Sequence, residues 1–515
     1  MRWALLQRAR PGAALALAAL VALGCEGSGS SGGGLEVSNE PIAPNCTPFA
    51  SQFPSGMVLL ASGRAIASQD RPEALLSFDL EGNAPALRAV DTIGPDSDLD
   101  GVDDRLGNPI GLPIAPRLGE LNLAPDGTAL LSTSNYEQVL LRWTSPLGPR
   151  LIEIATPLGL DVFYPGLPAP GGSSMRAGVS TLACVSPPDP FDSGGQAIGA
   201  SCNPSAPSFL TSFTAGAAVV GGHLFVATSN LDVFVDRFRP GTVLVYDWDD
   251  TGPLLRVAPD AATPVLFTTA FNPTSVAPFT TPGGRNLALV TATGSIGAGV
   301  GTSNVRTEGA VDVIDADTLR IVATIPLGFA GPSYDPVAID PSGSVALLGA
   351  TSTRHLFAID LRPLDDPNLY LGGPPVVLDG LSVGFPDARI FDADRPLVLP
   401  DRPDGAPAVE CDGFTFTAWN DAGDAAFATD WCDGTISTLR VTIAPSDPVP
   451  FPRDRFEVTG RLDSFATRLS LGLLRAPSRP RVRPGMPGID YRGPDVFVLI
   501  GDPDAQICAL RIESP

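Results

Sequence analysis

The chain has 515 residues, 44% hydrophobic and 17% charged, which is enough apolar material for a large buried core and argues against disorder. All 33 basic residues are arginines, which excludes mechanisms that require a lysine: a Walker-type phosphate site, a pyridoxal phosphate Schiff base or a serine–lysine pair. The 56 acidic residues bring the net charge to −23, so we expect no binding to nucleic acid.

Residues 1–24 have the features of an export signal. Three arginines among the first ten residues precede the apolar run Ala13 to Leu23, which is too short to cross a bilayer as a helix. The stretch Ala22-Leu-Gly-Cys25 resembles the lipobox of bacterial lipoproteins, and the resemblance implies cleavage before Cys25 and a diacylglycerol on its thiol. In that family an aspartate after the cysteine favours retention at the inner membrane, so Glu26 implies the outer membrane. The alternative is an ordinary secreted protein cleaved nearby.

Residues 25–45 are predicted to form a flexible tether. The stretch Gly27 to Gly34 contains only glycine and serine, which cannot bury apolar surface. Removing residues 1–24 takes away three arginines and no acid, which makes the net charge of the remainder −26. We therefore expect an acidic globular part, held away from the membrane by its tether at the cell envelope.

Six cysteines remain once Cys25 is assigned to lipid, and export favours disulfides among them. Six cysteines can pair in fifteen ways, so composition does not choose a pattern. The predicted pairs are Cys411–Cys432, Cys184–Cys202 and Cys46–Cys508. The alternative leaves some of them as free buried thiols.

Position along the chain suggests these three pairs. Two apolar runs joined by the turn Asn420 to Gly423 lie between Cys411 and Cys432, and a tight hairpin centred on that turn would place the two cysteines opposite each other. Cys184 and Cys202 share one segment rich in Pro, Gly and Ser. The last pair, obtained by elimination, would join the two ends of the globular region.

An acidic loop at residues 96–104 is the most specific motif for a metal. Carboxylates of Asp96, Asp98, Asp100 and Asp104 occupy positions one, three, five and nine, Gly101 is sixth, and the carbonyl of Val102 is seventh. The run resembles thrombospondin type 3 repeats more than an EF-hand, because position twelve is Gly107 and no flanking helices are evident. The resemblance implies a structural calcium ion that orders an insertion at residues 94–116. The alternative is a solvated acidic loop.

One unit recurs through residues 46–515: a turn, an apolar strand, a loop and a second apolar strand. The seven copies are Gly56–Ser62 with Ala74–Asp79, Leu123–Leu131 with Val139–Trp143, Gly221–Thr228 with Thr242–Asp247, Gly284–Thr291 with Ala310–Asp315, Ile339–Leu348 with His355–Asp360, Gly423–Thr429 with Ile436–Val441, and Asp495–Ile500 with Cys508–Ile512.

These copies predict an all-β fold, a β-propeller of seven blades closed by strands from both termini. The turns Pro-Asp-Gly at 125–127 and Asp-Pro-Ser-Gly at 340–343 resemble those of YVTN-type and lactonase-like seven-bladed propellers. Irregular spacing predicts long insertions between strands, at 94–116, 157–208, 294–309 and 363–412. The alternative architecture is tandem β-sandwiches, although no linker follows residue 34.

Histidines and tryptophans offer little catalytic chemistry. His223 and His355 each begin an apolar strand in a different repeat, which is typical of ordinary strand-edge residues, and two histidines do not build a propeller metal centre. We expect the tryptophans Trp143, Trp248, Trp419 and Trp431 to pack between blades.

Two functions follow from this pattern. The favoured one is a monomeric, lipid-anchored, calcium-stabilised propeller that binds a protein, peptide or glycan partner through its faces or inserted loops. The alternative is a lactonase-like or other hydrolytic enzyme with carboxylates and arginines at the mouth of the channel. Binding is favoured because the residue types that most often carry catalysis are scarce.

Overall fold

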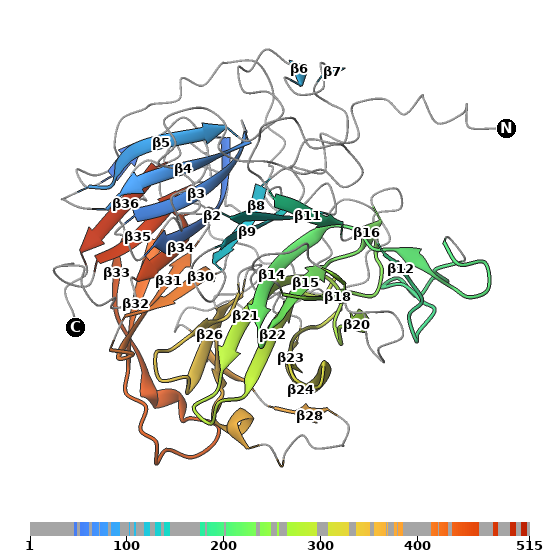
Figure 1. The fold of residues 1–515 in the computed structure, drawn as a ribbon. Coiled ribbons are helices and arrows are strands. Elements are labelled where there is room, and N and C mark those ends of the chain that lie inside the picture. Colours follow the sequence, from blue (N-terminus) through green and yellow to red (C-terminus); the bar gives the residue numbers. More distant parts are fainter. Residues whose placement is uncertain are drawn as a thin grey trace, which may run out of the picture.

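Strands account for nearly all the regular structure in the computed structural model of this chain (Figure 1). The structure describes residues 46–48, 52–60, 64–71, 73–80, 84–92, 102–103, 108–109, 118–123, 129–134, 139–144, 176–180, 183–199, 202–232, 237–248, 255–256, 265–295, 307–328, 336–350, 355–366, 368, 375–378, 380–384, 414–420, 422–430, 435–462, 477–482, 495–500 and 506–511.

The described residues form seven sheets of four or five strands, which follow one another along the chain as blades 1 to 7 of a β-propeller. Blade 1 contains β2 (Gln52–Leu60), β3 (Arg64–Arg71), β4 (Glu73–Asp79) and β5 (Ala86–Thr92). Blade 2 contains β8 (Leu118–Leu123), β9 (Ala129–Ser134), β10 (Val139–Thr144) and β11 (Arg176–Ser180). Blade 3 contains β14 (Thr214–Val220), β15 (His223–Thr228) and β18 (Thr242–Asp247), whose outer edge pairs with both β19 (Leu255–Arg256) and β20 (Val265–Phe267).

The second half of the chain builds the remaining blades. Blade 4 contains β21 (Pro273–Thr280), β22 (Asn286–Ala292), β23 (Gly309–Asp315), β24 (Arg320–Gly328) and a parallel fifth strand, β28 (Val376–Val377). Blade 5 contains β25 (Ala338–Ile339), β26 (Val345–Gly349), β27 (His355–Asp360) and β29 (Leu381–Gly384). Blade 6 contains β30 (Phe414–Trp419), β31 (Ala425–Asp430), β32 (Thr435–Val441) and β33 (Phe456–Leu462). Blade 7 contains β34 (Pro477–Val482), β35 (Asp495–Ile500), β36 (Gln506–Arg511) and β1 (Cys46–Pro48).

The short elements lie between or within these blades. They are the strands β6 (Val102–Asp103), β7 (Asn108–Pro109), β12 (Cys184–Val185), β13 (Phe209–Leu210), β16 (Leu231–Asp232) and β17 (Arg237–Phe238), and the 3-10 helices η1 (Arg362–Asp365) and η3 (Arg453–Arg455). No helix in the described ranges is long and apolar enough to cross a membrane.

The core consists of apolar layers between successive blades. The middle strands are rich in Val, Leu, Ile and Ala, and β23 is buried along its whole length, because its two faces pack against different neighbours. Separate apolar clusters fill the interfaces between blades 3 and 4, blades 4 and 5, and blades 5 and 6. Trp419 belongs to the last of these and donates from Nε1 to the carbonyl of Ala338, 2.9 Å away, which confirms its predicted packing between blades.

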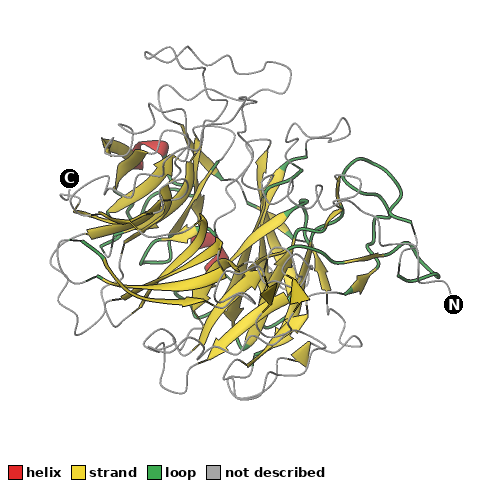
Figure 2. Ribbon diagram, turned by 90° about the horizontal axis from the view of Figure 1, so that it is seen from above, coloured by secondary structure: helices red, strands yellow, loops and turns green. Residues whose placement is uncertain are grey.

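The first strand of each blade lies toward the centre of the ring. Strand β8 contacts β2 and β14, β14 contacts β21, and β34 contacts both β30 and β2. At Gly216 a Cβ would lie 2.5 Å from the Cα of Ser275, so only glycine permits β14 and β21 to approach this closely. Seen from above, the sheets fan out around this centre (Figure 2).

The ring closes by a strand from each terminus, as predicted. Strand β1 pairs antiparallel with β36, and the blue N-terminal and red C-terminal sheets lie side by side in Figure 1. Cys46 is 4% exposed and disulfide-bonded, and the residue directly opposite it on β36 is Cys508. This placement fits the predicted pairing of Cys46 with Cys508, which stays a prediction.

Three details differ from the expectations. The insertion predicted at 157–208 contains β11, the outer strand of blade 2, and the one at 363–412 contains β28 and β29. These outer strands are short and carry no long apolar run, so they resemble loop sequence. In the β30–β31 hairpin Trp419 pairs with Ala426, two residues beyond the expected Asp424, because the loop contains four residues rather than two.

Candidate functional site

Blade 3 carries a projection, which we call the side lobe: residues 183–213 and 229–241. The first part is the connection from blade 2 to blade 3, and the second is the loop between β15 and β18. In Figure 1 the lobe extends away from the ring around β12 and β16. The two parts come from different loops and combine into one surface.

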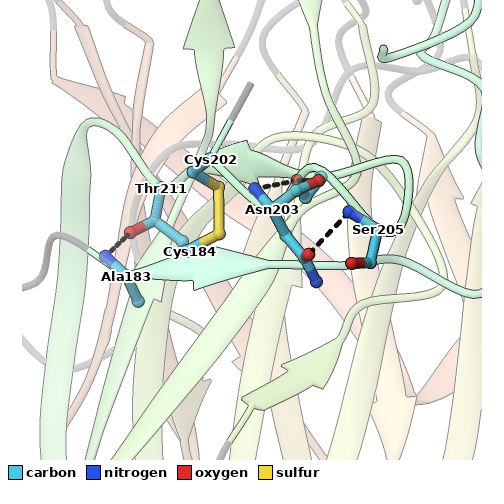
Figure 3. The surroundings of a disulfide bond; sticks show 7 residues. Ala183, Cys184, Cys202, Asn203, Ser205 and Thr211 are labelled. Carbon is cyan, nitrogen blue, oxygen red and sulfur yellow. Dashed lines mark hydrogen bonds between the residues drawn. A yellow bond between two sulfur atoms is a disulfide. The ribbon is translucent and has the colours of Figure 1, made fainter. Parts of the chain in front are cut away.

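A disulfide closes the first part of the lobe. Cys184 and Cys202 are bonded as predicted, with their Cα atoms 5.9 Å apart (Figure 3). Cys184 lies on β12, which pairs with β13, and the amide of Ala183 donates to Oγ1 of Thr211 over 2.7 Å beside it. The bond therefore fastens the loop between β12 and β13 to the base of the lobe.

Asn230 joins the two parts of the lobe. Its side chain is fully buried; Oδ1 accepts from the amide of Ser212 over 3.0 Å, and Nδ2 donates to the carbonyl of Pro240 over 2.8 Å. Its φ of 57° lies in the left-handed region, which asparagine tolerates better than most residues. The amide of Asn230 also donates to the carbonyl of Ser212 over 2.9 Å, so this one residue makes a reciprocal contact between the insertions.

Charges inside the lobe are paired. Arg239 places Nη2 2.6 Å from Oδ2 of Asp232, and its guanidinium lies 5.5 Å from the centre of the buried Phe209 ring. Arg237 has its Nη1 3.7 Å from Oδ2 of Asp192, and both side chains are almost buried. These pairs stabilise the lobe internally, and the two aspartates outside them, Asp189 and Asp236, leave the lobe with a net negative charge.

Two large apolar side chains are exposed on the lobe, among polar residues such as Ser186, Asp189 and Gln196. On the β12–β13 hairpin Val185 and Phe209 face the core, whereas Leu210 lies opposite Cys184 and is 48% exposed. Phe191 in the enclosed loop is 49% exposed. Exposed aromatic and aliphatic side chains on a fastened loop can bind a partner without a large loss of conformational entropy.

The histidines occupy the strand-edge positions predicted for them. His223 begins β15, and its Nδ1 lies 3.3 Å from Oδ1 of Asp247 at the end of β18. The carboxylate of Asp247 could orient the imidazole of His223. Trp248, the next residue after Asp247, is partly buried and packs against the apolar core of blade 3. His355 begins β27, but its side chain lies outside the described residues. Among the described side chains no three His, Cys, Asp or Glu gather closely enough to hold a metal ion.

Several predicted site residues lie outside the described residues: Cys25, Asp96, Asp98, Asp100, Asp104, Cys411 and Cys432. Of the predicted calcium loop only the end is described, where Val102 begins β6 and pairs with Pro109. The second part of the side lobe, residues 229–241, was not predicted from the sequence. Its signal is the gap between the apolar strands of the third repeat, which contains Asn230 and the Arg-Phe-Arg run at 237–239.

No protein-family model and no curated protein matches the sequence. Among solved structures, the chain is similar to the β-propeller domain of Cps50 (Swd1) from Myceliophteria thermophila, with 10% identity, a TM-score of 0.45, and coverage of 91% of this chain and 100% of that one. It is also similar to hydrazine synthase from Kuenenia stuttgartiensis, with 10% identity, a TM-score of 0.49, and coverage of 94% and 100%. The assignment of a β-propeller rests on the seven sheets and their closure between β1 and β36.

Proposed function

We propose that this β-propeller is exported, anchored by lipid on Cys25 at the cell envelope, and acts as a binding or scaffold protein through its side lobe. The side lobe carries the proposal: two insertions, one closed by a disulfide, expose Phe191 and Leu210 on a chain of net charge −23. Surface loops on a rigid scaffold are where binding residues concentrate. Exposed apolar groups in such loops favour a protein or peptide partner with apolar side chains in its contact surface.

Photo-crosslinking in intact cells tests the docking role. A photoreactive residue replaces Phe191 or Leu210 in turn, and the controls replace Leu87 or Val458, which are 40% and 43% exposed on blades 1 and 6. We expect a discrete adduct from the lobe positions and none from the controls. Equal adducts from all four positions, or none from the lobe, would contradict the proposal.

We also propose a structural calcium ion at Asp96, Asp98, Asp100, the carbonyl of Val102 and Asp104. The spacing of hard oxygen ligands around a glycine supports it, and β6 and β7 pair immediately after the loop, which would hold the segment from Val102 onward. A ligand that binds only the folded state raises the melting temperature. Calcium should raise that of the parent, and the Asp98→Asn/Asp100→Asn variant should lose the rise. An equal shift in both would rule the site out.

A further inference from the structure

A buried carboxyl group lies beside the connection between blades 3 and 4, and no described side chain forms an ion pair with it. Asp312 on β23 has no exposed surface. Its Oδ2 accepts a hydrogen bond from the amide of Thr269 over 2.7 Å, and its Oδ1 accepts from Oγ1 of Thr324 over 2.8 Å. Thr269 belongs to the connection of residues 268–272, whereas Thr324 is on the neighbouring strand β24. The carboxyl therefore holds this connection against blade 4.

Burial raises the pKa of Asp312, and it outweighs the hydrogen bonds from Thr269 and Thr324, which act to lower that pKa. No ion pair contributes among the described residues. Strands β20 and β22 and residues 268–272 contain no titratable side chain. The titratable groups of the other adjoining strands lie at strand ends. Asp315 lies opposite Arg320 in the β23–β24 ladder and forms its ion pair with Arg285, Tyr246 and Asp247 end β18, and Glu308 precedes β23 and is exposed.

The connection held by Asp312 also touches the base of the side lobe. The amide of Thr268 donates to the carbonyl of Gly241 over 3.0 Å, and a Cβ at Gly241 would lie 2.3 Å from Cδ of Pro273. On its other side, the carbonyl of Phe271 accepts from the amide of Gly294 over 2.9 Å. A movement of this connection would therefore disturb both the side lobe and the loop that follows β22.

We propose that Asp312 is a pH-operated latch that fastens the connection of residues 268–272 to blade 4 when it is protonated. When Asp312 loses its proton to solvent, the closed arrangement holds a negative charge in a fully buried site without an ion pair among the described residues. The arrangement in which water reaches the carboxylate then becomes relatively more stable. Thr269 is itself exposed, so a small outward movement of the connection is enough to admit water. The role of the latch in partner binding rests on the proposed docking role of the side lobe, whereas the latch itself does not.

The sign of the effect follows from the raised pKa. The stabilisation from Asp312 is fully present below the ordinary aspartate pKa of 3.8 and is lost as the pH rises through the higher value in the folded protein. Asp315 on the same strand behaves oppositely. Burial acts to raise the pKa of Asp315, but hydrogen bonds from Thr318 and Arg285 outweigh it and lower that pKa. Asp315 is therefore a matched control.

Amide hydrogen exchange of the mature protein, read at Thr269 and Gly294, tests the latch. After correction for the intrinsic rates, protection in the parent should fall as the pH rises from below 3.8 to neutral, by about tenfold for each unit by which the pKa is raised. Asp312→Asn should abolish this dependence, and Asp315→Asn should retain it. Protection that does not change with pH in the parent, or that falls equally in Asp312→Asn, would overturn the proposal.

A second variant keeps the test decisive if Asp312→Asn fails to fold. Thr324→Val removes a donor that favours the ionised carboxyl, so the loss of protection should move to higher pH. An unchanged midpoint would count against the latch. Hydrogen exchange measures only the connection, whereas the crosslinks at Phe191 measure docking of a partner. If the latch is wrong, exchange will not depend on pH as expected but the crosslinks will still form. If the docking site is wrong, the crosslinks will be missing but the pH dependence of exchange will remain.

Discussion

Arginine side chains fasten the loops of neighbouring blades to one another. Arg362 in η1 of blade 5 bonds Asp360 through Nε at 2.9 Å and Nη2 at 2.6 Å. The same guanidinium donates to the carbonyls of Asp447 and Pro448 in blade 6, and it lies 3.8 Å from the centre of the Phe451 ring. A planar group with five donors can make all these contacts at once, which lysine cannot. In this chain the absence of lysine is thus matched by a structural use of arginine.

The Arg362→Lys variant should lower the free energy of unfolding by about 2 kcal/mol, because charge-assisted hydrogen bonds and the stacking on Phe451 are lost. Urea denaturation of the purified protein measures this. The matched control is Arg440→Lys, whose partner Glu457 is 64% exposed, and it should change stability by less than about 0.5 kcal/mol. Similar losses in both variants would show that Arg362 does not act as an interblade fastener.

Aspartates at the ends of strands and in the turns between them made the repeat recognisable in the sequence. Asp315 and Asp360 end the third strands of blades 4 and 5 and accept hydrogen bonds from the turns that follow. Asp340 similarly accepts from the amides of Ser344 and Val345 at 2.7 Å. These local contacts need a particular residue at a particular position, so they leave a pattern in the sequence. A contact between distant segments, such as the hydrogen bond from Thr269 to the buried Asp312, leaves none.

At the scale of the element, the sequence predicted the middle strands better than the edges of the blades. Strands such as β22 and β23 are buried on both faces and read as continuous apolar runs. The inner strand β14 is rich in alanine and glycine, and β25 is only two residues long, so neither shows a strand pattern. The side lobe was only partly predicted because its two parts meet through Asn230, a contact between loops that are separate in sequence.

Removing the disulfide should loosen the side lobe and leave the ring intact. In the Cys184→Ser/Cys202→Ser variant, a loop of this length loses about 3 kcal/mol of stabilisation against local opening. Limited proteolysis should cleave within residues 186–199 faster than in the parent, while the melting transition of the ring stays close to its original temperature. A large drop in that temperature would mean that the lobe is part of the core rather than a separate surface.

The whole molecule depends on joining its two termini in one blade. The pairing of β1 with β36 turns an open row of sheets into a ring and covers the edge of β36 with a strand of only three residues. This closure was predictable, because a propeller of about seven repeats must close and cysteines stand near both ends of the globular region. The exact register of hairpins such as β30–β31 was not, since a bulge or a longer turn shifts pairing without changing the apolar pattern.

We propose that this seven-bladed ring is exported, anchored by lipid on Cys25 and closed by a disulfide between Cys46 and Cys508. Mass spectrometry of non-reduced peptides from the protein purified out of membranes tests it most directly. We expect an N-terminal peptide that begins at Cys25 and carries diacylglycerol, together with a peptide in which Cys46 is bonded to Cys508. An unmodified Cys25 inside a longer N-terminal peptide, or Cys46 bonded to any other cysteine, would contradict it.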